Sequence, residues 1–336
     1  MRFTPNVVPV ESGDYKSRNS VVYYISTRAQ ETDMVSKETL KDLAIEAGFD
    51  LVGFTTPPTR EETVEYSLEI DERKSRGFKP RESYPWMESW RIPDETRSIV
   101  VLGFNYYQEL PEEPLLDSEL LIARYLTGSC PALISRLKKF HRSLEVLGIK
   151  VLSHIGPSEL PLKWLAKRAG LGWIGKNSLL LTEEYGSWVI WDAVPLMEEF
   201  PPDEPKEFAG CGDCDECVRA CPTSAIYEPY KLDPLRCFTY FSETLASMDG
   251  AWPIRQAREA FGRRILGCDI CQDVCPHNRH VNKSCTSDVA RLPLHIDAST
   301  LINLDEDTFE NLYRLMLWGI PKRRVQEMLD LMHGRP

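Results

Sequence analysis

The chain has 336 residues, of which 42% are hydrophobic and 27% are charged, the usual balance of a soluble globular protein. Its formal net charge of -11 disfavours binding to nucleic acid or to an anionic membrane by charge alone. No apolar run reaches the roughly 20 residues of a membrane-spanning helix, and the N-terminus lacks the apolar core of a signal peptide. The sequence therefore predicts a cytoplasmic protein that makes no use of a membrane.

Helices and strands are predicted to alternate after an N-terminal extension (residues 1–35). Ser36 is a candidate N-cap of a helix that ends at Gly48, and apolar residues then predict a strand at 51–54. Further strands are predicted at 98–104, 150–154 and 187–194, and further helices at 131–147 and 162–169. This alternation predicts an α/β or α+β domain over residues 36–200.

A second domain is predicted at residues 201–290. The stretch 198–208, rich in proline and acidic residues, indicates the boundary, and every cysteine except Cys130 lies between Cys211 and Cys285. Crowding of this kind indicates bound metal more than a disulfide framework. After it, residues 291–336 are predicted to form a C-terminal helical segment.

The cysteines form two related motifs. The first is Cys-x2-Cys-x2-Cys-x3-Cys-Pro, made by Cys211, Cys214, Cys217 and Cys221. The second repeats the end of that pattern with a distant leading residue, and consists of Cys237, Cys268, Cys271 and Cys275. Such spacing is typical of ferredoxins that hold two 4Fe-4S clusters, in which the last cysteine of each motif ligates the other cluster.

This crossover predicts two sets of ligands. One cluster takes Cys211, Cys214, Cys217 and Cys275, and the other takes Cys221, Cys237, Cys268 and Cys271. Four thiolates also satisfy zinc, so two zinc sites are the alternative. Cys130 and Cys285 lie outside the pattern, and a lone cysteine is most often a small buried hydrophobic residue.

The cysteine motifs, together with four other segments, resemble the epoxyqueuosine reductase family. The resemblance covers residues 36–320 and is carried by ARYLTG (123–128), LAKRAGLGWIGKNSLLL (165–181), CPTSAIYEPYKLDPLRC (221–237) and GCDICQDVCPHN (267–278). It implies a nitroreductase-like corrinoid-binding domain followed by a ferredoxin-like double-cluster domain. It also implies that electrons pass through two 4Fe-4S clusters to base-off cobalamin and then to the substrate.

By the same resemblance, the corrinoid is expected near one glycine-rich turn. The candidate contacts are Asn105, Gly170, Gly172, Trp173, Gly175, Lys176 and Ser178. The turn also matches the dinucleotide pattern G-x-G-x-x-G, but it follows a predicted helix where that fingerprint requires a strand. These glycines are therefore also candidates for a helix C-cap and a close-packed turn.

The family's acidic proton donor falls at Gly156 in this chain, so another acid is needed. His154, Glu159 and Tyr106 are candidates because each side chain can deliver a proton, and Arg124 is a candidate to hold an anionic substrate. Structural roles compete in each case. Tyr106 ends a predicted strand, where aromatic residues pack, and Arg124 has the charge to pair with an acid.

The resemblance also implies an external electron donor of the ferredoxin or flavodoxin type. Epoxyqueuosine reductases act on tRNA, an assignment weakened here by the acidic net charge and by the absence of helical repeats before Pro336. Reductive dehalogenation of a small molecule is the enzymatic alternative. A second alternative is an electron carrier, or an activator of a corrinoid on another subunit, with no substrate chemistry of its own.

Overall fold

The structure is a computed structural model in which the chain divides into two units, Met1–Val35 and Ser36–Pro336. It describes residues 35–62, 92–110, 119–152, 160–243, 261–281, 294–297, 300, 303–310 and 317–332. The predicted N-terminal extension and the candidates His154, Gly156, Glu159 and Cys285 lie outside these residues.

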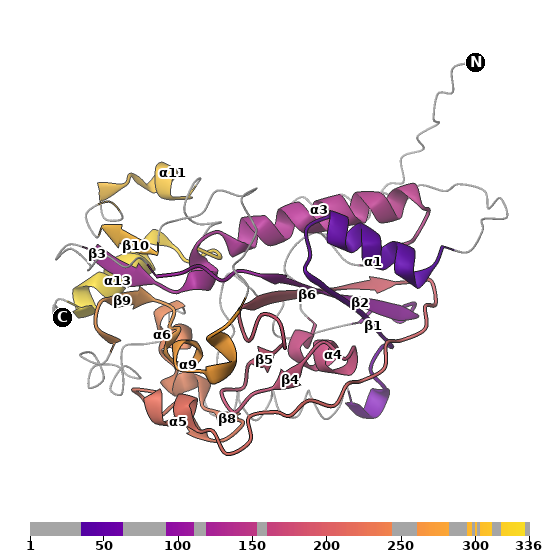
Figure 1. The fold of residues 1–336 in the computed structure, drawn as a ribbon. Helices are drawn as coiled ribbons and strands as arrows, with labels where there is room; N and C mark the ends of the chain where they lie inside the picture. The colour runs from indigo at the N-terminus through magenta and orange to yellow at the C-terminus, as the bar shows by residue number, and fades with distance from the viewer. Residues whose placement is uncertain are drawn as a thin grey trace. The chain divides into compact units, whose positions relative to one another are not determined.

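A three-stranded antiparallel sheet forms the centre of the first part of the unit. Strand β2 (Ser98–Asn105) lies between β1 (Leu51–Thr55) and β6 (Val189–Leu196), with Val101 opposite both Gly53 and Ala193. Every residue of β2 is buried, because helices cover both faces of the sheet (Figure 1). A strand that is buried on both faces is apolar at nearly every position. This pattern is what predicts a strand at 98–104.

Helix α4 (Leu162–Arg168) covers one face, where Ile99 and Val101 pack against Leu165 and Ala166. Helices α1 (Lys37–Glu46) and α3 (Ser129–Val146) lie over the other, and the guanidinium of Arg136 stacks on the Phe104 ring at 4.5 Å. Side chains of a strand alternate between faces, so odd and even positions of β2 meet different helices.

The predicted N-cap of α1 is confirmed. The Ser36 hydroxyl accepts a hydrogen bond from the Thr39 N–H, and Gly48 follows the helix with a left-handed φ of 104°. The strand predicted at 150–154 is wrong over its described residues, because Val151 makes only an isolated bridge to Leu196. Only this one residue pairs with the edge of the sheet, and a single pair does not make a strand.

A second sheet lies away from the first and was not predicted. Strand β3 (Glu119–Ile122) pairs antiparallel with β10 (His295–Asp297) and parallel with β9 (Arg264–Leu266). The 3-10 turn η2 (Arg124–Leu126) follows β3 directly.

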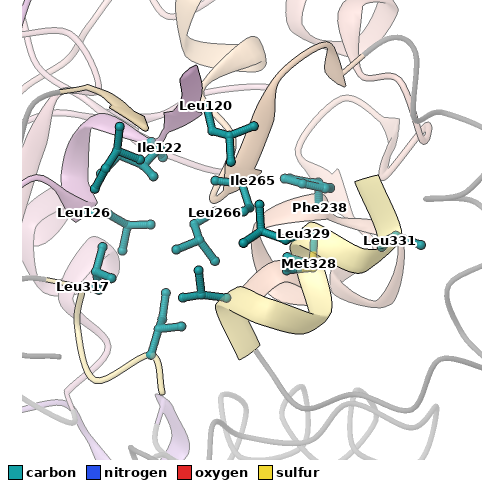
Figure 2. Packing of buried hydrophobic residues seen from close by; sticks show 14 of the residues in the cluster. Leu120, Ile122, Leu126, Phe238, Ile265, Leu266, Leu317, Met328, Leu329 and Leu331 are labelled. Carbon is teal, nitrogen blue, oxygen red and sulfur yellow. The ribbon is translucent and has the colours of Figure 1, made fainter. Parts of the chain in front are cut away.

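This second sheet carries a core with α6 (Phe238–Glu243) and α13 (Lys322–Met332) (Figure 2). Leu120, Phe238, Leu266 and Met328 all belong to that core. It therefore joins residues of three predicted segments, 36–200, 201–290 and 291–336, and the boundaries between those segments stay predictions. The short helix α11 (Glu306–Thr308) begins at the N-cap Asp305.

The cysteine-rich segment consists of short elements. They are α5 (Glu216–Ala220), β7 (Ile226–Glu228), β8 (Lys231–Leu232), η3 (Pro234–Arg236), α9 (Ile270–Asp273) and η5 (Pro276–Asn278). Helices α5 and α9 contact each other, and the small hairpin β4 (Trp173–Ile174) with β5 (Leu180–Leu181) completes the described strands (Figure 1). In the described part of the chain, no helix combines the length and apolarity needed to cross a membrane.

Candidate metal centre

The first cysteine motif folds around a cavity. The Cys214 N–H donates to the Cys211 carbonyl at 3.0 Å, which closes a turn, and α5 then carries Cys217. These three cysteines and Cys275, from the other motif, line one pocket. The Lys176 ammonium donates to the Gly212 carbonyl at 2.6 Å and so holds the motif against the glycine-rich turn.

The remaining four cysteines gather around Cys271. Burial raises the pKa of the Cys271 thiol well above its usual value, and the adjacent thiols of Cys268, Cys237 and Cys221 raise it further. The thiols that act on Cys217 are those of Cys211, Cys214 and Cys275, and the thiols that act on Cys271 are those of Cys221, Cys237 and Cys268, so the eight cysteines lie in two neighbourhoods.

Burial also raises the pKa of two other thiols, that of Cys217 to about 11 and that of Cys268 to about 12. Without metal, both thiols are neutral at pH 7, because burial disfavours the charged thiolate and the neighbouring thiols add to that cost. A cation or cationic cluster removes this cost, and its binding releases the protons.

The two crossing cysteines have the same backbone conformation. Cys221 has φ -69° and ψ 110°, and Cys275 has φ -69° and ψ 124°. Each precedes a proline, which favours this extended conformation. The Ala225 N–H donates to the Cys221 sulfur at 3.2 Å, a bond typical of thiolates that hold iron–sulfur clusters.

A buried ion pair ties the second motif to the turn after β3. The Arg124 guanidinium lies 3.1 Å from Asp269 and 2.7 Å from Asp273, on the loop that carries Cys268 and Cys271. It also stacks on the Trp188 ring at 4.6 Å. Burial lowers the pKa of Arg124, but the two carboxylates outweigh it and the net shift is upward, so this arginine is charged and fully engaged.

A second set of polar contacts runs beside that pair. The Tyr106 hydroxyl donates to Gln272 Oε1 at 3.2 Å, and the Ser187 hydroxyl donates to the same oxygen at 2.9 Å. Asn278 accepts from the Ser187 N–H at 2.8 Å. Burial raises the pKa of Tyr106, so its phenol is neutral. Tyr106 and Arg124 therefore hold the second motif in place, and their predicted catalytic roles stay predictions.

The glycine-rich turn is packed with protein atoms. A Cβ on Gly172 would lie 2.0 Å from the Leu181 carbonyl oxygen, one on Gly170 would lie 2.5 Å from the Glu204 oxygen, and one on Gly175 would lie 2.1 Å from Leu181 Cδ1. Gly170 also has a left-handed φ of 68° after α4. These glycines form the C-cap and close-packed turn that the sequence offered as the alternative to a ligand groove.

The other corrinoid candidates make internal contacts as well. Asn105 is buried and accepts from the Tyr107 N–H, Trp173 packs on the rings of Phe208 and His277, and the Ser178 hydroxyl donates to the Tyr230 carbonyl. The eight thiols thus fit two iron–sulfur clusters. The described corrinoid candidates contact protein atoms, and their roles toward the corrinoid stay predictions.

Comparison with known proteins agrees with the cysteine geometry. Residues 210–278 match the family model of a 4Fe-4S double cluster binding domain. The chain is 30% identical to an epoxyqueuosine reductase of Prochlorococcus marinus over 289 residues, covering 80% of this chain and 87% of that protein. It is 32% identical to the Escherichia coli epoxyqueuosine reductase over 287 residues, covering 79% and 71% of the two chains.

Solved structures agree with this result. A crystal structure of epoxyqueuosine reductase with an epoxyqueuosine-modified tRNA-Tyr stem loop has a TM-score of 0.74 at 26% identity, over 88% of this chain and 80% of that one. The fold and its cysteine centre define an iron–sulfur oxidoreductase with a double-cluster domain. The chain belongs to the epoxyqueuosine reductase family. The predicted fold class and the predicted 4Fe-4S chemistry are confirmed.

Sequence reasoning missed the polar partners of the second motif. Asp269, Gln272 and Asn278 lie between or just after the cysteines, and their partners are distant along the chain, 145 residues away for Arg124 and Asp269. Their only mark in the sequence is their position within a metal-binding loop, where side chains that do not bind metal often orient those that do.

Proposed function

We propose that this protein uses electrons from two 4Fe-4S clusters, through bound cobalamin, to remove the epoxide oxygen of epoxyqueuosine in tRNA. The observation that carries the proposal is the gathering of eight cysteines into two groups of four in a chain of this family. The reaction balances with two electrons and two protons: both C–O bonds of the epoxide break, a C=C bond forms, and water leaves.

The ligand sets are part of the proposal. Cys211, Cys214, Cys217 and Cys275 hold one cluster and Cys221, Cys237, Cys268 and Cys271 hold the other. Each 4Fe-4S cluster cycles one electron, so two of them store the two that the reaction consumes. The crossing cysteines Cys221 and Cys275 link the two sites covalently, because each belongs to the motif of one cluster and ligates the other.

A base-off corrinoid, when bound, supplies a strong cobalt reductant that acts on the substrate. The chain must then deliver protons near that site. His154 and Glu159 remain the proposed sources, because the family's acid is replaced by Gly156. Asn105 ends β2, and Tyr106, the next residue, donates to Gln272 in the second cysteine motif; the proposal puts the corrinoid near this end of the strand.

Two observations bear on tRNA as substrate. The chain covers 87% of the Prochlorococcus marinus relative, so a long C-terminal extension is not common to all proteins with that name. Against this, Arg324 is buried and donates to the Ser242 carbonyl, so it is not part of a phosphate-binding surface. RNA contact must therefore come from other cationic residues.

The proposal includes an external donor of the ferredoxin or flavodoxin type and a cytoplasmic location. Low-potential clusters need a reductant that renews them after each turnover, and a reducing compartment keeps the eight thiols free of disulfides before the clusters assemble. Among the described residues, none of these eight cysteines is joined in a disulfide.

The experiment is a single-turnover assay. Protein loaded anaerobically with iron, sulfide and cobalamin is reduced chemically and mixed with tRNA that contains epoxyqueuosine, and mass spectrometry follows the loss of one oxygen atom. Protein loaded with the clusters alone is the control, and the proposal requires it to be inactive.

Other outcomes replace the proposal. Loss of halide from a haloaromatic compound, with epoxyqueuosine tRNA unchanged, would establish the dehalogenase-like alternative. Cluster oxidation by a separate corrinoid protein, with neither substrate changed, would establish the electron-carrier alternative.

A further inference from the structure

The turn that follows Cys221 folds back onto the sulfur of that cysteine. The Ser224 N–H donates to the Cys221 carbonyl at 3.0 Å, which closes the turn, and Ser224 has a left-handed φ of 50°. The next N–H, that of Ala225, donates to Cys221 Sγ at 3.2 Å. The Asp233 N–H donates to the Ala225 carbonyl at 2.8 Å and holds this end of the turn in place. The sulfur of Cys221 is therefore fixed against residues 223–225.

Thr223 adds a side-chain hydroxyl at the same sulfur. Its Oγ1 atom lies 3.7 Å from Cys221 Sγ, and hydrogen bonds to sulfur are longer than those to oxygen because the sulfur atom is larger. Thr223 is 4% exposed, so water has little access to this contact. A thiol and a hydroxyl can each donate, but a cysteine that binds metal is a thiolate and has no proton to give. When Cys221 binds iron, the hydroxyl must be the donor.

We propose that the Thr223 hydroxyl donates an O–H···S hydrogen bond to the Cys221 thiolate and raises the reduction potential of the cluster that Cys221 ligates. This inference rests on the proposed function and its ligand sets, in which that cluster is shared with Cys237, Cys268 and Cys271. A hydrogen bond to a ligand sulfur stabilises the reduced, more negative cluster. Because Thr223 acts through Cys221, it is a positioning residue.

The crossover of ligands gives the proposal a specific direction. Thr223 follows the last cysteine of the first motif, yet its hydroxyl acts on the cluster that the second motif mainly holds. A second threonine supports the same cluster. Burial raises the pKa of the Cys237 thiol, and hydrogen bonds from the Tyr240 and Thr239 backbone and from the Thr239 side chain oppose that shift. Hydroxyl groups thus serve two of the four ligands of this cluster.

The test is a redox titration of the intact protein with both clusters, followed by electron paramagnetic resonance. Thr223→Val replaces the hydroxyl by a methyl group of similar size, and Thr223→Ser keeps the hydroxyl. Thr96→Val is the matched control, because the Thr96 hydroxyl is also buried but has no partner among the described residues. The two signals are assigned with Cys211→Ser and Cys237→Ser, each of which should remove one cluster.

We expect the potential of the cluster that Cys237→Ser removes to fall in Thr223→Val and to return toward the wild-type value in Thr223→Ser. The other potential, and both potentials in Thr96→Val, should match the wild type. An unchanged potential in Thr223→Val, a shift of the other cluster, or equal shifts of both would overturn the inference. If Thr223→Val loses iron, Thr223→Ala decides by the same criteria. Wild-type protein that holds zinc in place of iron would overturn the proposed function itself, a result distinct from these.

Discussion

Arg124 Nη1 lies 3.1 Å from Asp269 Oδ2, and both side chains are buried. The backbone N–H of Arg124 donates to the same carboxylate at 2.9 Å. Both the backbone and the side chain of Arg124 therefore bind the loop between Cys268 and Cys271. Burial raises the pKa of Asp269, and Arg124 opposes that shift. The pair joins the turn after β3 to a cluster ligand loop 145 residues later.

Arg124→Met should therefore act on stability and cluster retention before catalysis. Removing one partner of a buried ion pair leaves an uncompensated charge and costs about 3–5 kcal/mol. We expect a lower thermal unfolding midpoint and a lower iron content per chain. Exposed Arg323→Met, one residue from the buried Arg324, is the control. A variant with normal unfolding and full iron but no turnover would instead establish the catalytic role predicted from the sequence.

The crossover of ligands predicts a specific pattern in double variants. Cys211→Ser with Cys275→Ser should remove one cluster, as each single variant does, because both residues belong to the same group. Cys268→Ser with Cys275→Ser should remove both clusters. Iron analysis and electron paramagnetic resonance count the clusters, with Cys130→Ala retaining both. If the Cys211 and Cys275 pair removed both clusters, the crossover would be wrong.

Asp203 should contribute stability that depends on pH. Burial acts to raise the pKa of this carboxyl, but hydrogen bonds from Lys41, Lys37 and the Phe54 N–H outweigh it and the net shift is downward. A carboxyl with a depressed pKa in the folded state stabilises the protein above its unfolded pKa of about 3.9. That stabilisation is lost as the pH falls through the lower, folded value.

Hydrogen exchange of the Phe54 amide measures this, because that N–H donates to Asp203 Oδ2 at 2.8 Å. Relative to wild type, Asp203→Asn should exchange about tenfold faster at pH 7, corresponding to about 1.4 kcal/mol. The ratio should approach one as the wild-type carboxyl is protonated. The exposed Asp42→Asn on α1 serves as control. A ratio that stays constant with pH would contradict the assignment.

Gly172→Ala should destabilise the fold by about 3 kcal/mol, because the new Cβ would overlap the Leu181 carbonyl, a backbone atom that cannot turn aside. Gly148→Ala is the comparison: its Cβ meets nothing within 4 Å, and only its φ of 73° adds strain, about 1 kcal/mol. Thermal unfolding separates the two. A Gly172→Ala protein of normal stability that fails to bind corrinoid would restore the ligand groove predicted from the sequence.

The chemistry of the centre could be predicted from local spacing, because cluster ligands are arranged by tight turns within each motif. Cys211 to Cys221 and Cys268 to Cys275 are of this kind. Likewise, the cap at Ser36 and the buried strand β2 depend on neighbouring residues alone. Such features are determined within a few residues of chain.

The rest depends on pairings between distant segments. Nothing near Arg124 in the sequence reveals Asp269, and β3 forms because β9 and β10 flank it. In the sequence Arg324 follows Lys322 and Arg323, a run typical of an exposed basic surface, yet its side chain is 1% exposed and donates to the Ser242 carbonyl. In each case the side chain could equally lie in solvent or bind an internal partner. Which of the two occurs depends on tertiary contacts that the local sequence does not show.

The most direct test of the account is the metal content of protein purified anaerobically with cobalamin supplied, together with its absorption spectrum. Two 4Fe-4S clusters and one corrinoid predict roughly eight irons and about one cobalt per chain. Roughly eight irons without cobalt would remove the corrinoid step and leave an electron carrier. Zinc in place of iron would contradict the account at its centre.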